Sequence, residues 1–213
     1  METKHLSFEY QAKYCILGIP GPHIEKIWFV LHGYGQLARY FIRKFNCLDD
    51  GRHLIVAPEG LSRFYLEGFE GKVGATWMTK EERESDITNY LAYLNTLGDA
   101  ILKHKELKNP HITLLGFSQG AATASRWVAA TDIKFDRFIL WAGAFPEDLN
   151  LKGANKSLSK SDNFLVVGSQ DQFLTDKRIS DQENFWKKLN ITPQIITFDG
   201  GHEIDQEVLK RFI

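Results

Sequence analysis

The stretch HITLLGFSQGAATASRWVAA, at residues 111–130, decides the fold of this chain. The apolar, β-branched run at 112–115 predicts a buried strand, and the small residues at 121–130 predict a helix. Between them, GFSQG at 116–120 matches a sharp strand-to-helix turn in which glycines relieve crowding and the serine is held over the sheet. The alternative is an ordinary turn whose serine only caps the helix. The strand before and the Ala-rich helix after favour the first interpretation, so Ser118 is the predicted nucleophile.

The composition is that of an ordinary globular protein. A length of 213 residues fits one domain, here 1–213, and 43% hydrophobic with 25% charged residues argues against a disordered or fibrous chain. A formal net charge of -1 creates no field for nucleic acid, so no nucleic-acid partner is expected. No export signal and no apolar run of membrane-spanning length occur, which predicts a cytoplasmic protein without stable membrane insertion. The two cysteines, Cys15 and Cys47, lack metal-ligand spacing, so no metal is expected.

Apolar runs alternate with segments of helical spacing along most of the chain. Further buried strands are predicted at residues 26–31, 53–57, 137–141, 163–167 and 194–198, with an edge strand or hairpin at 6–17. Helices are predicted at 39–48, from a capping box at 79–82 to residue 104, at 176–189 and at 203–213. This alternation predicts an α/β fold with a mostly parallel central sheet and helices on both faces. Residues 61–78 have many aromatic side chains and no clean period, which predicts a long loop that is either functional or locally disordered.

A serine nucleophile needs a base, and the base needs a carboxylate that holds its tautomer. With a nucleophile in this kind of turn, the chain order is serine, acid, histidine. Of the seven histidines only His202 lies well downstream of Ser118, directly after the last predicted strand, where open parallel sheets place their sites. His202 is therefore the predicted base.

Four aspartates compete for the role of the acid. Asp171 follows the strand at 163–167 and should lie at the same edge of the sheet as Ser118 and His202. Asp162 precedes that strand and should lie at the opposite edge, and Asp176 fits the first turn of the next helix. Asp171 is the predicted acid, with Asp199 as the second candidate.

A tetrahedral oxyanion needs two converging backbone N–H donors, one after the nucleophile and one from the loop after an earlier strand. Gln119 and Tyr34 are the predicted donors. Tyr34 lies in HGYG at residues 32–35, where the glycines let the backbone approach the substrate. His32 precedes Ser118 and is predicted to orient this loop by hydrogen bonding, not to act as the base.

Four motifs in this order, LHGYG at 31–35, GFSQG, GSQDQF at 168–173 and GGH at 200–202, resemble the α/β-hydrolase fold and its phospholipase/carboxylesterase family, which includes acyl-protein thioesterases. The resemblance covers the chain from about residue 26 onward. It implies Ser118, Asp171 and His202 as a catalytic triad, Tyr34 and Gln119 as oxyanion donors, and no cofactor. The chain departs from the family at Gln36, where an acidic residue is common, and at Phe173-Leu174, where Val-Pro is common.

Substrate specificity is expected in the loops above the sheet. An apolar substrate pocket is predicted from Trp77, Phe64, Tyr65, Phe69 and Phe173, with Phe145 beside them. The alternative for each of these residues is a small core under a long loop.

The predicted function is hydrolysis of small-molecule carboxylic esters or thioesters through an acyl-enzyme intermediate. A homodimer is compatible with the sequence. The rival enzyme is a serine peptidase on the same fold, because ester and amide cleavage use one set of residues. The rival from another class is a hydrolase-like ligand-binding protein without turnover.

Overall fold

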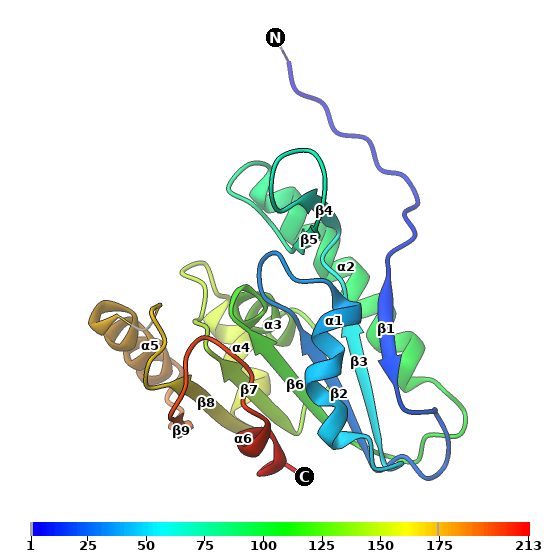
Figure 1. Cartoon of the computed structure of the whole chain (residues 1–213), viewed down its shortest axis with the longest axis vertical. Coiled ribbons are helices and arrows are strands. Elements are labelled where there is room, and N and C mark those ends of the chain that lie inside the picture. Colours follow the sequence, from blue (N-terminus) through cyan, green and yellow to red (C-terminus); the bar gives the residue numbers. More distant parts are fainter. Residues whose placement is uncertain (1, 174) are drawn as a thin grey trace.

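A seven-stranded sheet forms the centre of the molecule (Figure 1). In this computed structural model residues 2–173 and 175–213 are described, so Met1 and Leu174, the second residue of the Phe173-Leu174 departure, lie outside the description. The strands are β1 (Tyr14–Leu17), β2 (Lys26–Leu31), β3 (His53–Pro58), β6 (His111–Phe117), β7 (Arg137–Trp141), β8 (Asp162–Gly168) and β9 (Gln194–Phe198). Their order is β1-β3-β2-β6-β7-β8-β9, and only β1 pairs antiparallel with its neighbour. The predicted mostly parallel sheet is confirmed.

Helices cover both faces of this sheet, as predicted. The helices are α1 (Ala38–Phe41), the 3₁₀ helix η1 (Ile42–Leu48), α2 (Arg83–Leu102), α3 (Gln119–Ala129), α4 (Leu151–Leu158), α5 (Asp176–Leu189) and α6 (Gln206–Lys210). Buried side chains of α2, α3, α4 and α5 join the core on one face, and those of α1, η1 and α6 join the core on the other. Within the described ranges, none of the helices combines the length and apolar character needed to cross a bilayer.

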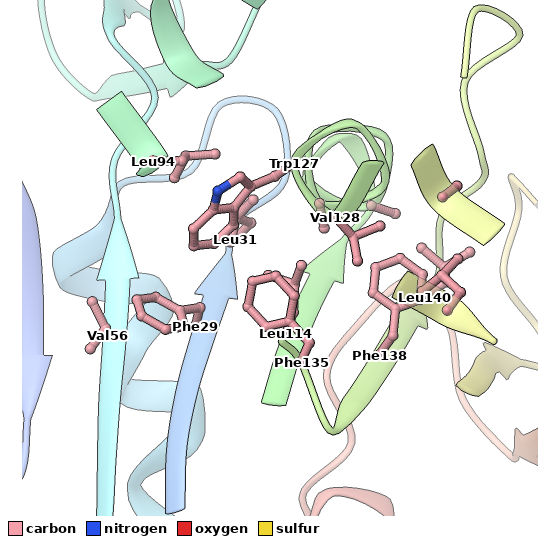
Figure 2. Packing of buried hydrophobic residues seen from close by; sticks show 14 of the residues in the cluster. Phe29, Leu31, Val56, Leu94, Leu114, Trp127, Val128, Phe135, Phe138 and Leu140 are labelled. Atoms are coloured by element: carbon pink, nitrogen blue, oxygen red, sulfur yellow. The ribbon is translucent and has the colours of Figure 1, made fainter. Parts of the chain in front are cut away.

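The central strands have continuous apolar sequences because both of their faces are buried. In β2, Phe29 and Leu31 face the α2 and α3 side, while Trp28 and Val30 face the opposite core, and all four are fully buried. Figure 2 shows Phe29 beside Trp127 of α3, whose ring centroid lies 5.3 Å away in an edge-to-face arrangement. A strand buried on both faces has no polar alternation.

Residues 61–78 are not an irregular loop, and the prediction was wrong here. They contain an antiparallel pair, β4 (Ser62–Tyr65) and β5 (Val73–Thr76). The alternation of apolar and polar residues that marks a strand is absent from the sequence of β5, because β5 packs closely against the loop after β2. A Cβ on Gly74 would lie 2.5 Å from the carbonyl oxygen of Gly35. Close backbone approach selects small residues at such positions instead of large apolar ones.

Other elements also differ from prediction. The helix predicted at 39–48 is divided into α1 and η1, and the helix predicted at 203–213 is limited to Gln206–Lys210. Helix α2 begins at Arg83 after Glu82, which adopts a left-handed φ of 51°, so the capping box predicted at 79–82 does not form. Helix α4 was not predicted, because its sequence LKGANKSL buries only Ala154 and Leu158. At the N-terminus only Tyr14–Leu17 pairs with the sheet.

Candidate active site

Ser118 lies in the turn between β6 and α3, where the backbone is strained. Its φ of 54° and ψ of -119° are values that residues with a side chain rarely adopt. Both flanking glycines are required sterically: a Cβ on Gly116 would lie 2.4 Å from the carbonyl oxygen of Gly120, and one on Gly120 would lie 2.3 Å from that of Leu31. The turn therefore holds the serine at the carboxyl edge of the sheet.

The side chains of Ser118, His202 and Asp171 form a hydrogen-bonded chain. Nε2 of His202 lies 2.8 Å from Oγ of Ser118, and Nδ1 of His202 lies 2.7 Å from Oδ2 of Asp171. If Nδ1–H donates to the carboxylate, Nε2 is free to accept the serine proton. The buried carboxylate also accepts the backbone N–H of Phe173 through Oδ1 at 2.8 Å.

Close contact between two loops brings Asp171 and His202 together. A Cβ on Gly168, the last residue of β8, would lie 2.4 Å from the carbonyl oxygens of both Gly200 and Gly201. The imidazole of His202 then packs against the rings of Phe117 and Phe173, at centroid distances of 5.0 and 4.7 Å. These contacts restrict the orientation of the ring.

Asp199 and Asp162 do not bond to His202. Oδ1 of Asp199 accepts a hydrogen bond from the side-chain amide of Gln170 at 2.7 Å. Asp162 is the first residue of β8, so it lies at the opposite edge of the sheet, and Asp176 begins helix α5. Asp171 is therefore the aspartate that the fold places beside the imidazole.

Tyr34 and Gln119, the predicted oxyanion donors, line the same cavity as Ser118. In the described part of the chain, neither backbone N–H has an intramolecular acceptor. Oε1 of Gln36 accepts the N–H of Gly33 at 2.9 Å, so the side chain of Gln36 holds the loop after β2. Two free N–H groups beside a serine can donate hydrogen bonds to an oxyanion.

Strand β5 and the residues after it brace both of these donors. The N–H of Gly35, next to Tyr34, donates to the carbonyl of Ala75 at 2.9 Å. The side chain of Gln119 donates through Nε2 to Oγ1 of Thr76 at 2.8 Å and to the carbonyl of Met78 at 2.9 Å. Its Oε1 accepts the N–H of Trp77 at 3.2 Å. The sequence carries no local signal for this brace, because Gln119 and Thr76 are 43 positions apart.

His32 supports the loop of Tyr34 and is not free to act as a base. Its Nδ1 lies 2.7 Å from the carbonyl oxygen of Gly33, and its Nε2 accepts the N–H of Gly60 at 2.9 Å. Burial lowers the pKa of His32 from 6.5 to about 4, so the ring is neutral near pH 7. The indole of Trp77 stacks on this ring and donates to the carbonyl of His32 at 2.8 Å.

The aromatic residues predicted to contact substrate divide into two groups. Phe173 and Phe145 line a cavity of about 880 Å³ that opens at Ser118 and His202. Trp77, Phe64, Tyr65 and Phe69 are not among its lining residues. Trp77 is 1% exposed in the core, the ring of Phe64 lies 5.1 Å from that of Tyr34, and Phe69 is 93% exposed. Trp77 follows β5 and stacks on His32. Phe64, Tyr65 and Phe69 belong to the β4–β5 hairpin, which contacts the loop of Tyr34.

The arrangement supplies a hydroxyl next to an imidazole, a carboxylate that can stabilise the imidazolium, and two unpaired N–H groups. Such a set can transfer an acyl group through a serine ester. Over the residues that the structure describes, no group of three or more histidine, cysteine, aspartate or glutamate side chains is arranged to hold a metal ion.

A family model described as Serine hydrolase (FSH1) matches residues 24–208. Among curated proteins no significant match is found. Acyl-protein thioesterase 2 of Zea mays has a TM-score of 0.68 and 15% identity, over 95% of this chain and 98% of its own. A phospholipase/carboxylesterase of Dyadobacter fermentans has a TM-score of 0.65 and 17% identity, over 96% of both chains. The Bacillus cereus carboxylesterase has a TM-score of 0.66 and 14% identity, over 94% of this chain and 91% of its own. Identities this low demonstrate a shared fold alone.

Proposed function

Since the chain belongs to the serine hydrolase family described as FSH1, we propose that it hydrolyses small-molecule carboxylic esters or thioesters through an acyl-enzyme intermediate. The membership and the fold confirm the predicted resemblance to α/β-hydrolases of the phospholipase/carboxylesterase type and the prediction of an enzyme. The choice of esters and thioesters draws on the names of the structural relatives, which include a carboxylesterase and a thioesterase.

In the proposed mechanism Oγ of Ser118 attacks the carbonyl carbon and passes its proton to Nε2 of His202. The carbonyl oxygen becomes an oxyanion that accepts hydrogen bonds from the N–H groups of Tyr34 and Gln119. When the tetrahedral intermediate collapses, the imidazolium returns the proton to the leaving alkoxide or thiolate. Water then attacks the acyl-serine by the same relay, and the acid leaves. Asp171 holds the imidazole and stabilises its charged form.

The observation that carries this proposal is the 2.8 Å separation of Ser118 Oγ and His202 Nε2 in a strained turn. A base at hydrogen-bond distance accelerates such a proton transfer by about 10²–10⁴-fold. Each oxyanion donor contributes about 10²–10³-fold more. The residues of the relay all come from one chain, so the mechanism needs no second subunit.

Fluorophosphonate labelling with mass spectrometry tests the proposal directly. The native protein and a Ser159→Ala control, altered at an exposed serine after α4, should carry one adduct on Ser118. Ser118→Ala should carry none and should lose hydrolysis of aryl esters and acyl thioesters. Absence of an adduct from the folded native protein would favour a ligand-binding protein. Faster cleavage of aminoacyl amides than of esters would favour a peptidase.

A further inference from the structure

The cavity that opens at Ser118 continues far from the reacting groups. It passes beneath helix α5, and its floor is formed by Leu165 and Val167 of β8 and by Ile195 and Thr197 of β9. Figure 1 shows α5 at the β8 and β9 end of the sheet. At a rise of about 3.3 Å per residue, the path from Thr197 back to Pro193 is about 13 Å long. The cavity is therefore much longer than an acetyl group requires.

This part of the sheet lacks the cover that parallel strands normally have. On the opposite face Phe164, Val166 and Phe198 are buried against α6 and its neighbours. On the cavity face Ile195 remains 64% exposed. Parallel strands are usually buried on both faces by their crossover helices, and α5 is the crossover between β8 and β9.

Helix α5 is attached to the core mainly through its carboxyl-terminal half. The ring of Trp186 lies 4.7 Å from that of Phe145, and the carbonyl of Leu189 accepts the side-chain amide of Asn155 at 2.6 Å. Nearer its start, Ile179 lines the cavity and is 40% exposed. Ile179 and Trp186 of this helix line the same cavity as Leu165 and Ile195 of the strands, so apolar side chains lie on both sides of a groove.

From this geometry, and resting on the proposed function, we propose that the groove between α5 and strands β8 and β9 binds a long apolar chain of the substrate. The chain is joined to the carbonyl that Ser118 attacks, because the groove begins at Ser118 and His202. It belongs either to the acyl group or to the alcohol or thiol. A chain in the groove would cover Ile195 and Ile179, so burial of these side chains favours binding. Arg178, Glu183 and Lys187 also line the groove and are exposed, and the guanidinium of Arg178 donates to the carbonyl of Phe173 at 3.1 Å.

Two series of esters test this inference on the native protein below the micelle concentration. One series lengthens the acyl chain from acetyl through octanoyl to dodecanoyl with a constant alcohol, and the other lengthens the alcohol with a constant acetyl group. In one series kcat/KM should rise by about three- to fourfold for each methylene that leaves water. The series that rises identifies the half of the substrate that occupies the groove.

A charged substitution then locates the chain. Ile195→Glu should lower the ratio of long-chain to acetyl kcat/KM by about tenfold or more, because a carboxylate opposes burial of the chain. Ile19→Glu makes the same change at an isoleucine that is 76% exposed and outside the cavity, and it should keep the native ratio. Ser118-dependent hydrolysis of the acetyl ester with no length dependence in either series would overturn the inference and leave the proposed function standing. Absence of hydrolysis in every arm would overturn both.

Discussion

Oδ2 of Asp171 lies 2.7 Å from Nδ1 of His202, whereas Asp199, only three positions before the histidine, bonds to Gln170 instead. Nearness in sequence therefore does not select the acid. The loop after β8 selects it, because Gly168 lets that loop contact the Gly200-Gly201 turn.

Asp171→Asn should lower kcat by about 10⁴-fold, since an amide favours the wrong imidazole tautomer and does not stabilise the imidazolium. Asp199→Asn is the matched control and should keep kcat within about twofold of the native value. Steady-state hydrolysis of an aryl ester measures both. The reverse ranking of the two variants would assign the acid to Asp199.

Gln119→Ala should lower kcat by about 10²-fold although the backbone N–H of residue 119 remains. The lost side chain holds Thr76, Trp77 and Met78, so both oxyanion donors become less well placed. Gln194→Ala, at an exposed glutamine at the start of β9, is the control. A double-mutant cycle with Thr76→Val should give a coupling energy of about 1 kcal/mol or more in the activation free energy. If the effects of the two substitutions on the activation free energy were strictly additive, the side chains of Gln119 and Thr76 would not act together, and this prediction would be wrong.

Gly120→Ala should lower the free energy of unfolding by about 3 kcal/mol or prevent folding, because the added Cβ meets the carbonyl oxygen of Leu31 at 2.3 Å. Gly201→Ala adds the same methyl group where no atom lies within 4 Å, and should change stability by less than about 1 kcal/mol. Urea unfolding followed by circular dichroism compares the two. Equal stabilities would show that the turn can relax around a side chain.

Stability should fall as pH falls through the titration range of His32. Its folded-state pKa of about 4 lies below the ordinary 6.5, so between these values the unfolded chain binds a proton that the folded protein excludes. From about pH 7 to about pH 5 this should cost about 2 kcal/mol of unfolding free energy. His32→Asn should flatten that decline, and His104→Asn, at an exposed histidine, should not. Parallel declines in native protein and His32→Asn would rule out His32 as the source.

The sequence predicted the sheet well because burial leaves a local record. The ranges of β2, β7 and β9 match the predicted apolar runs. For β2 and β7 the reason is burial on both faces, which needs consecutive apolar residues. The turn at Ser118 was equally visible in the sequence. A Cβ at either of its glycines would collide with backbone atoms of the turn or of the adjacent strand, so both positions must be glycine. The sequence also named Ser118, Asp171 and His202, which the fold places at hydrogen-bond distance, and their catalytic roles stay predictions.

By itself, then, the sequence indicated the parallel sheet, the serine turn and the order of the candidate triad, because apolar runs and the residues that follow them are visible in the local pattern. Only the tertiary structure decided that Trp77 is core, that Thr76 and Met78 brace Gln119, and that the cavity runs under α5. These features depend on contacts between segments far apart in the chain, such as the 43 positions between Gln119 and Thr76. Apolar side chains in a core, in a brace or along a cavity have the same local pattern, and packing alone distinguishes them.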